Sequence, residues 1–155
     1  YAQQKITQLK DSFQIFADEE RKREVFKLQA IHVPGSSAAF EVMDVENSEK
    51  IGEIHRKKGK QLSVDEWHLA NPAGDVIALM LEDSAQKAMW RRWLLGSLLP
   101  PAYNLRMADS HVGLITTKIG WRSFELFYDF TLDITGKLDR RLALCAGLLL
   151  STATN

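Results

Sequence analysis

The chain has 155 residues and carries 20 Lys and Arg against 20 Asp and Glu, so its formal net charge at pH 7 is zero. This balance argues against general nucleic-acid binding, which draws on a basic excess, although it leaves room for a local basic patch. The length fits one domain, residues 1–155, that buries about two-thirds of its unfolded surface. The polar N-terminal segment predicts no signal peptide, and the single cysteine, Cys145, fits a reducing, cytoplasmic compartment.

Four turns rich in Asp, Asn or Gly separate pairs of apolar, β-branched runs. Apolar and polar residues alternate on either side of each turn, and this pattern predicts a β-hairpin. The predicted strand pairs are 13–16 with 25–28, 40–43 with 51–54, 67–69 with 76–81, and 105–107 with 112–115. A further long strand is predicted over 123–133, where apolar residues share one face.

The turns recur at similar intervals, and only the third interval is longer. A regular series of hairpins predicts an antiparallel meander, and closure into a barrel would remove its exposed edges. The extra length lies in residues 84–99, which we predict to form an amphipathic helix. Ser84 is a suitable N-cap for that helix and Pro100 ends it.

The C-terminal run 138–150 is wholly apolar after Arg141. From Leu142 to Leu150 the only polar side chain is the thiol of Cys145, so a helix there has no hydrophilic face. Such a helix lies inside a protein or inside a membrane, and the run is about half of the roughly 20 residues that a membrane span needs. We therefore predict a mainly β fold, in which a meander of about ten strands closes into a barrel around this helix and the amphipathic helix caps one end.

Four short motifs point to a known family. They are Glu82-Asp83-Ser84 before the Arg91-Arg92 pair, Leu99-Pro100, Phe130-Thr131-Leu132-Asp133, and Gly136-Lys137-Leu138-Asp139-Arg140-Arg141-Leu142. Together they resemble the superfamily that joins tubby C-terminal domains, phospholipid scramblases and LURP-one-related proteins, and most of all its bacterial scramblase-like branch. The resemblance covers nearly the whole chain and implies a twelve-stranded barrel around a hydrophobic C-terminal helix.

Two features depart from the family pattern. About ten strands are predicted here, so we expect the first hairpin of the family barrel to be missing. Either a partner then covers the gap beside the helix, or the ten strands close alone. The apolar run is also followed only by residues 151–155, whereas family members often continue with a charged stretch.

Two basic segments are candidates for binding anionic lipid headgroups. They are Arg56, Lys57, Lys58 and Lys60 at a strand end, and Lys87, Arg91 and Arg92 on the predicted amphipathic helix. Clustered Lys and Arg gain roughly 1 kcal/mol each near an anionic surface, and a basic helix with Trp suits a membrane surface. The alternatives are a solvated turn for the first segment and a lid on the barrel for the second. Tubby domains bind phosphoinositides, but their ligand residues cannot be matched one by one to this chain.

Three charged residues, Asp139, Arg140 and Arg141, open the predicted C-terminal helix. Cations at a helix N-terminus oppose the macrodipole, so the two arginines need partners or water. We predict an ion-pair cluster at the mouth of the barrel, with Asp129 or Asp133 as a further member.

The remaining polar side chains form no catalytic or metal-binding motif. The histidines lie in different hairpins without the spacing of helical metal ligands, at His32, His55, His68 and His111. Glu41 and Glu53 fall on opposing strands, where a carboxylate pair is usually solvated.

We therefore predict a non-enzymatic lipid- or membrane-associated module without cofactor or metal, cytoplasmic or peripheral at the membrane. The alternative is a protein-interaction or structural scaffold, and a carrier of a small apolar ligand is disfavoured because the helix should fill the barrel.

Overall fold

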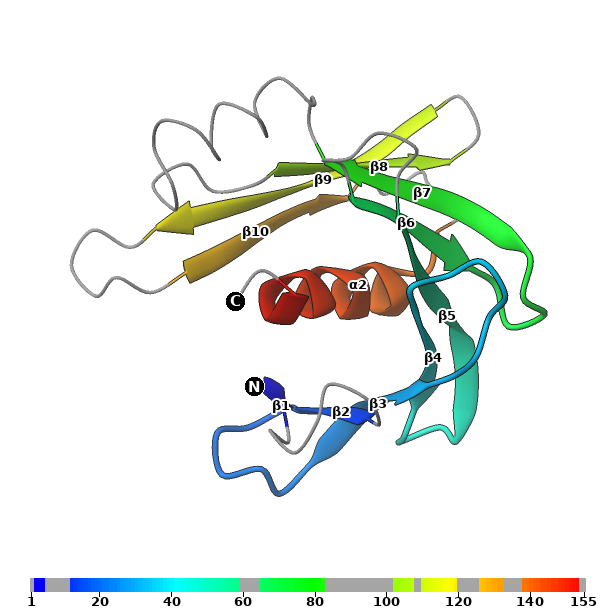
Figure 1. Ribbon diagram of the computed structural model, residues 1–155. Helices are drawn as coiled ribbons and strands as arrows, with labels where there is room; N and C mark the ends of the chain where they lie inside the picture. The colour runs from blue at the N-terminus through cyan, green and yellow to red at the C-terminus, as the bar shows by residue number, and fades with distance from the viewer. Residues whose placement is uncertain are drawn as a thin grey trace.

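The fold consists of one curved antiparallel sheet and a C-terminal helix (Figure 1). A computed structural model describes residues 2–4, 12–58, 65–82, 102–107, 110–119, 126–132 and 138–153. In these ranges the strands are β1 (Ala2–Gln4), β2 (Ser12–Phe16), β3 (Glu24–Ala30), β4 (Ala38–Asp44), β5 (Glu49–Lys58), β6 (Asp65–Ala70), β7 (Val76–Glu82), β8 (Ala102–Met107), β9 (Ser110–Ile119) and β10 (Leu126–Leu132), and the helix is α2 (Arg140–Ala153). The strands pair in sequence order, so the predicted mainly β meander with a C-terminal helix is confirmed. The helix predicted over 84–99 lies outside the described residues.

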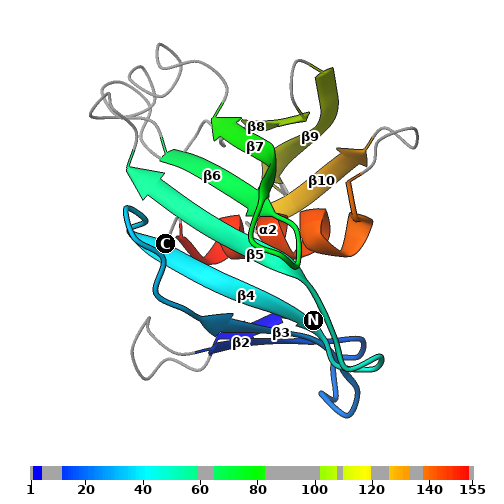
Figure 2. The same cartoon turned by 90° about the vertical axis from the view of Figure 1, so that its right-hand side faces the viewer.

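The four predicted hairpins are confirmed by the pairing of β2 with β3, β4 with β5, β6 with β7 and β8 with β9. Each hairpin has a register shift close to its turn, directly after Ile15, Val42, Leu69 and Leu105. A β-bulge bends its strand and increases the local twist. Four bulges at the same end of the sheet therefore favour the curvature by which the sheet wraps around α2, which Figures 1 and 2 show from two sides.

Side-chain carboxylates and amides fix the hairpin turns, as the sequence pattern predicts. Asp18 accepts hydrogen bonds from the backbone N–H groups of Lys22 and Arg23, both at 3.0 Å. The side-chain oxygen of Asn71 accepts one from the backbone N–H of Asp75 at 2.9 Å. Asp and Asn favour turns because their short side chains bond to nearby backbone in this way.

Alternate residues of the strands form an apolar inner face that packs against α2. On the sheet these are Phe13, Leu28, Val42, Ile54, Leu69, Met80 and Leu105, all buried. On the helix they are Leu142, Ala143, Cys145, Ala146, Leu149 and Leu150, also buried. The helix is not buried all round, however, because Leu144 is 39% exposed. The prediction that this helix is buried on every side is therefore wrong at Leu144.

Glycine allows α2 to approach β5 closely. A Cβ atom at Gly52 would overlap the backbone oxygen of Ala70 on β6 and lie 2.9 Å from Cδ2 of Leu142. The backbone of Gly52 also has a φ of +156°, which side chains disfavour. This position fixes where the first turn of α2 rests on the sheet.

The predicted closed barrel is not found in the described part of the chain, where no pairing joins β10 to β1. In Figure 1, β1 to β3 lie on one side of α2, and β9 and β10 lie on the opposite side. A helix with its side chains is about 10–12 Å wide, whereas paired strands lie only about 4.8 Å apart. Strands on opposite sides of α2 therefore cannot pair directly, and the sheet is not closed between β10 and β1 in the described part of the chain.

Candidate functional site

The basic segment at the end of β5 is divided between the two faces of the sheet. Arg56 shares the inner face with buried Ile54, and its guanidinium carbon lies 5.6 Å from the centroid of the Trp67 ring. Lys57 is on the outer face, where Glu66 on β6 is its Cα partner. Successive residues of a strand point to opposite faces, so adjacent basic residues in the sequence do not form one patch here.

Acidic residues of β6 stand directly across from the lysines of β5. In the register of the two strands, Lys57 is the partner of Glu66 and Lys58 is the partner of Asp65. Opposite charges placed directly across an antiparallel pair stabilise the sheet modestly. For Lys57, which is paired with Glu66, this register favours a structural role.

The other headgroup candidates, Lys60, Lys87, Arg91 and Arg92, lie outside the described residues. The strands that precede them are described, however. Because β5 and β7 are separated by one antiparallel strand, they run in the same direction and end at the same end of the sheet (Figure 2). Connections 59–64 and 83–101, which carry these candidates, therefore start from one end of the sheet.

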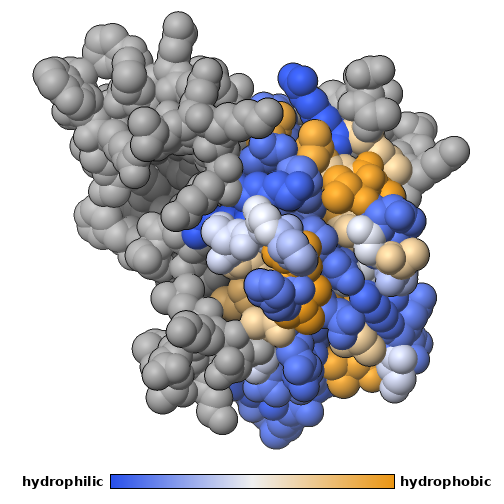
Figure 3. All heavy atoms as spheres, turned by 45° about the vertical axis from the view of Figure 1, so that its right-hand side comes forward, coloured by the Kyte–Doolittle hydropathy of each residue, from blue (hydrophilic) through white to orange (hydrophobic). Residues whose placement is uncertain are grey.

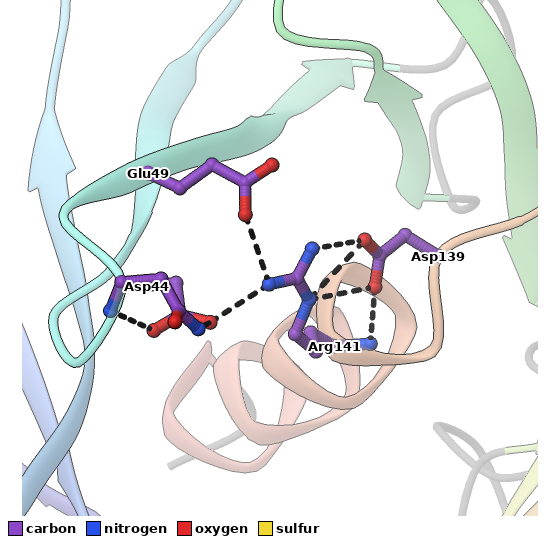
Figure 4. A network of polar contacts seen from close by, with 5 residues as sticks. Asp44, Glu49, Asp139 and Arg141 are labelled. Carbon is purple, nitrogen blue, oxygen red and sulfur yellow. Dashed lines mark hydrogen bonds and ion pairs between the residues drawn. The ribbon is translucent and has the colours of Figure 1, made fainter.

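A second polar cluster is centred on Arg141 in the first turn of α2 (Figure 4). Its guanidinium donates to Asp139 at 2.7 Å, to Asp44 at 2.7 Å and to Glu49 at 3.2 Å. Asp139 also caps the helix, because its carboxylate accepts the backbone N–H of Arg141 at 2.8 Å. The carboxylates offset the unfavourable position of a cation at a helix N-terminus.

This cluster matches the predicted ion-pair cluster only in part. Asp139 and Arg141 are brought together, whereas Arg140 is exposed and makes no ion pair with any residue that the structure describes. Asp133 lies outside the described residues. Asp44 and Glu49, at the ends of β4 and β5, were not predicted as partners. The sequence did contain a signal for the Asp44 contact, because the alternation along β4 places Asp44 on the inner face of the sheet, which packs against α2.

Hydrogen bonds within the cluster favour the ionised forms of Asp139 and Asp44 by lowering their pKa values. The pKa of Asp139 is lowered from its ordinary value, chiefly by side-chain hydrogen bonds from Arg141. The pKa of Asp44 is also lowered, chiefly by hydrogen bonds from the side chain and backbone of Asn47 and then by Arg141. The same bonds raise the pKa of Arg141, with Asp139 as the largest contributor. The cluster is therefore a fixed-charge clamp between the β4–β5 hairpin and α2.

A third polar group lies on the outer face of β4 and β5. Glu41 and Glu53 are Cα partners, as predicted, but they are bridged by Lys50, whose ammonium lies 3.0 Å from one carboxylate and 2.8 Å from the other. These contacts raise the pKa of Lys50, with Glu53 as the first cause. Burial alone would raise the pKa of Glu53, but hydrogen bonds from Lys50 and His55 lower it overall.

Two histidines meet beside this group, which the sequence did not predict. His55 and His68 are Cα partners on β5 and β6. His55 Nε2 lies 2.8 Å from Glu53, and His68 Nε2 lies 2.6 Å from Glu66. Among the described residues, however, no three His, Cys, Asp or Glu side chains are grouped to hold a metal ion.

On the face seen in Figure 3, hydrophilic and hydrophobic residues are interleaved, as expected for the outer side of a sheet.

Cys145 is fully buried between α2 and the sheet, and burial raises the pKa of its thiol to about 12. The reactive form of cysteine is the thiolate, so this side chain acts as a small apolar group.

Within the described ranges, no helix combines the length and the apolar character required to cross a bilayer.

Comparisons of the chain with protein-family models, with curated proteins and with solved structures found no match.

Proposed function

We propose that the chain is a non-enzymatic binding module of the tubby and scramblase-like kind, and that its ligand is the anionic headgroup of membrane lipids. The proposal takes the curved sheet of about ten strands, together with α2, as the counterpart of the family's closed barrel. In this view the protein is cytoplasmic and binds peripherally to the membrane.

The observation that supports lipid binding is the common origin of the basic segments. Arg56 lies near the end of β5, and connection 83–101, which contains Lys87, Arg91 and Arg92, leaves from the end of β7 at the same end of the sheet. Basic residues on segments that leave the same end of a sheet can face a membrane together, at roughly 1 kcal/mol each. This attraction falls with ionic strength, because the Debye length shortens to about 3 Å at 1 M salt.

Flotation with liposomes tests the proposal. The purified protein is mixed with neutral phosphatidylcholine vesicles, with vesicles containing phosphatidylglycerol, and with vesicles containing phosphoinositide, each at low and high salt. We expect binding only to the anionic vesicles, and loss of that binding at high salt. Absence of binding under every condition would refute the lipid proposal.

A matched pair of charge reversals locates the contact. One variant replaces Lys87, Arg91 and Arg92 by Glu. The control replaces the three exposed basic residues of the β2–β3 turn, at the opposite end of the sheet, by Glu; these are Arg21, Lys22 and Arg23. Both variants change the net charge equally. We expect the first to abolish flotation and the second to retain most of it.

The second candidate function is a protein-interaction scaffold, which is favoured by the exposure of Leu144. This leucine is 39% exposed on a helix whose other leucines are largely covered. Contiguous exposed apolar patches rimmed by polar residues mark protein contacts, and this second candidate function takes Leu144 as part of such a patch. If liposomes do not bind, a pull-down comparing the wild type with Leu144→Lys is the next experiment, and a partner lost only by the variant would support this function.

A further inference from the structure

One side of α2 is left partly uncovered by the rest of the chain. Arg140 and Leu144 are exposed there, and Leu148 is only partly buried. Because these residues are four positions apart, they lie on one face of the helix and form a stripe along it, the α2 stripe. The other leucines of the helix are buried in the core, so the α2 stripe is where α2 can meet another molecule.

The two ends of the α2 stripe differ in charge. Arg140 places a cation at the helix N-terminus, where the macrodipole is already positive, and it makes no ion pair with any residue that the structure describes. The last turn carries no basic residue to offset the negative C-terminal end of the dipole. A stripe with a cation at one end, a negative helix end at the other and leucines between them is complementary to a second copy of itself in reverse order.

We propose that two copies of the chain associate through their α2 stripes, with the two helices antiparallel and related by a two-fold axis. Leu144 of each copy then packs against Leu148 of the other. Because both helices rise by the same amount per residue, this register sets Arg140 of each copy against the last turn of the other helix, which ends at Ala153. Parallel helices would instead bring the two Arg140 side chains together, and like charges repel.

This inference rests on the scaffold function, the second candidate above, and names its partner as another copy of the chain. It is independent of the lipid headgroup proposal. The contact is small beside the roughly 1,200–2,000 Å² that stable interfaces bury, so we expect a weak dimer that forms as the protein concentration rises.

Sedimentation equilibrium over a wide range of concentration tests the association. The wild-type mass should rise from that of one chain, 17.6 kDa, toward twice that value. Leu144→Glu should weaken association about tenfold or more, because two buried leucines are lost from each dimer. The control is Val76→Glu at the start of β7, where the side chain is 48% exposed and lies outside the α2 stripe; it should associate as the wild type does. Equal effects of the two substitutions would overturn the inference.

Arg140→Glu tests the role of charge. An acidic residue suits the helix N-terminus, so the fold should be retained, which urea unfolding of dilute protein checks. The same residue would face the negative end of the other helix, so association should weaken several-fold. Association as strong as that of the wild type would overturn the antiparallel charge pairing.

Disulfide formation tests the orientation of the helices. Leu144→Cys and Leu148→Cys are each made in a Cys145→Ala background and oxidised separately and as a mixture. A disulfide needs Cα atoms within about 7 Å, so the antiparallel register predicts more covalent dimer in the mixture than in either variant alone. More covalent dimer in the separate samples would indicate parallel helices and overturn the inference. A wild type that stays monomeric at every concentration would overturn it as well, whereas the scaffold function would then still be decided by the pull-down.

Discussion

Arg141, in the first turn of α2, donates a 2.7 Å hydrogen bond to Asp44, which ends β4 and lies 97 positions earlier in the chain. Asp44 is 5% exposed, so this contact joins a nearly buried carboxylate to a cation on another element. Together with Asp139 and Glu49, the pair attaches α2 to the β4–β5 hairpin (Figure 4). The clamp acts beside the point where Leu142 packs over Gly52.

Removal of the Arg141 guanidinium should therefore destabilise the fold. Arg141→Met keeps the aliphatic part of the side chain and leaves the carboxylates of Asp44, Glu49 and Asp139 without their common partner. Since a third of the Arg141 side chain is exposed, we expect the free energy of unfolding to fall by on the order of 1–2 kcal/mol, less than for a fully buried charged pair.

The matched control is Arg140→Met at the exposed neighbouring position, which should change stability by less than about 0.5 kcal/mol. Urea unfolding followed by circular dichroism measures both variants. Equal effects of the two substitutions would contradict the clamp.

Acidification should weaken the same clamp. The pKa values of Asp139 and Asp44 are both lowered from the ordinary value of 3.8. A carboxyl group whose pKa is lower in the folded than in the unfolded protein contributes stability that is complete above the unfolded value and is lost as the pH falls through the folded value. We therefore expect this contribution to be constant from neutral pH down to about pH 5 and to decline below about pH 4.

Urea unfolding at a series of pH values between 7 and 2.5 measures this decline. The Asp44→Asn, Asp139→Asn double variant removes two of the titrating groups, so its stability should depend less on pH below 4 than that of the wild type. Parallel curves for the two proteins would show that the acid sensitivity arises elsewhere.

The local part of the fold could be predicted from the sequence because its causes are local. The hairpins follow from alternating residues and from turn residues such as Asp18 and Asn71, whose side chains bond to backbone a few positions away. The C-terminal helix follows from its apolar run, and Asp139 caps it as its position suggests.

The candidate sites depend on relationships that a single sequence does not display. Asp44 reaches Arg141 only because the hairpin end and the helix start meet in space, and His55 meets His68 only in the register of β5 and β6. The placement of Arg56 and Lys57 on opposite faces of the sheet could have been predicted, because alternation from Ile54 already places Arg56 on the inner face. Closure of the barrel depends on the sum of all strand twists and bulges, which no local pattern fixes.

Substitution of Gly52 should be poorly tolerated because α2 rests there. The added Cβ of Gly52→Ala would overlap the backbone oxygen of Ala70, which cannot move without shifting β6, and would crowd Leu142. Overpacking and an unfavourable φ each cost about 1–3 kcal/mol, so we expect a loss on the order of 3 kcal/mol.

Gly74 provides the control for Gly52. It also has a positive φ, +93°, but a Cβ there would meet no atom within 4 Å. Gly74→Ala should therefore cost only the backbone term, about 1 kcal/mol. Thermal unfolding of the two variants separates the steric effect from the conformational one, and equal losses of stability would show that neither Ala70 nor Leu142 resists a Cβ atom at position 52.

Cys145 should be unreactive in the folded protein. Its thiol is fully buried, and its pKa is raised from the ordinary value of 9.0 to about 12, chiefly by burial. At pH 8 only about one thiol in ten thousand is then ionised, and the thiolate is the species that attacks a disulfide reagent. We expect labelling by an aromatic disulfide reagent to be slow in native buffer and rapid in concentrated urea.

The matched control is Leu144→Cys in a Cys145→Ala background, which moves the thiol by one residue to a position that is 39% exposed. That variant should be labelled rapidly without urea, and equally rapid labelling of native Cys145 would show that α2 leaves the sheet readily.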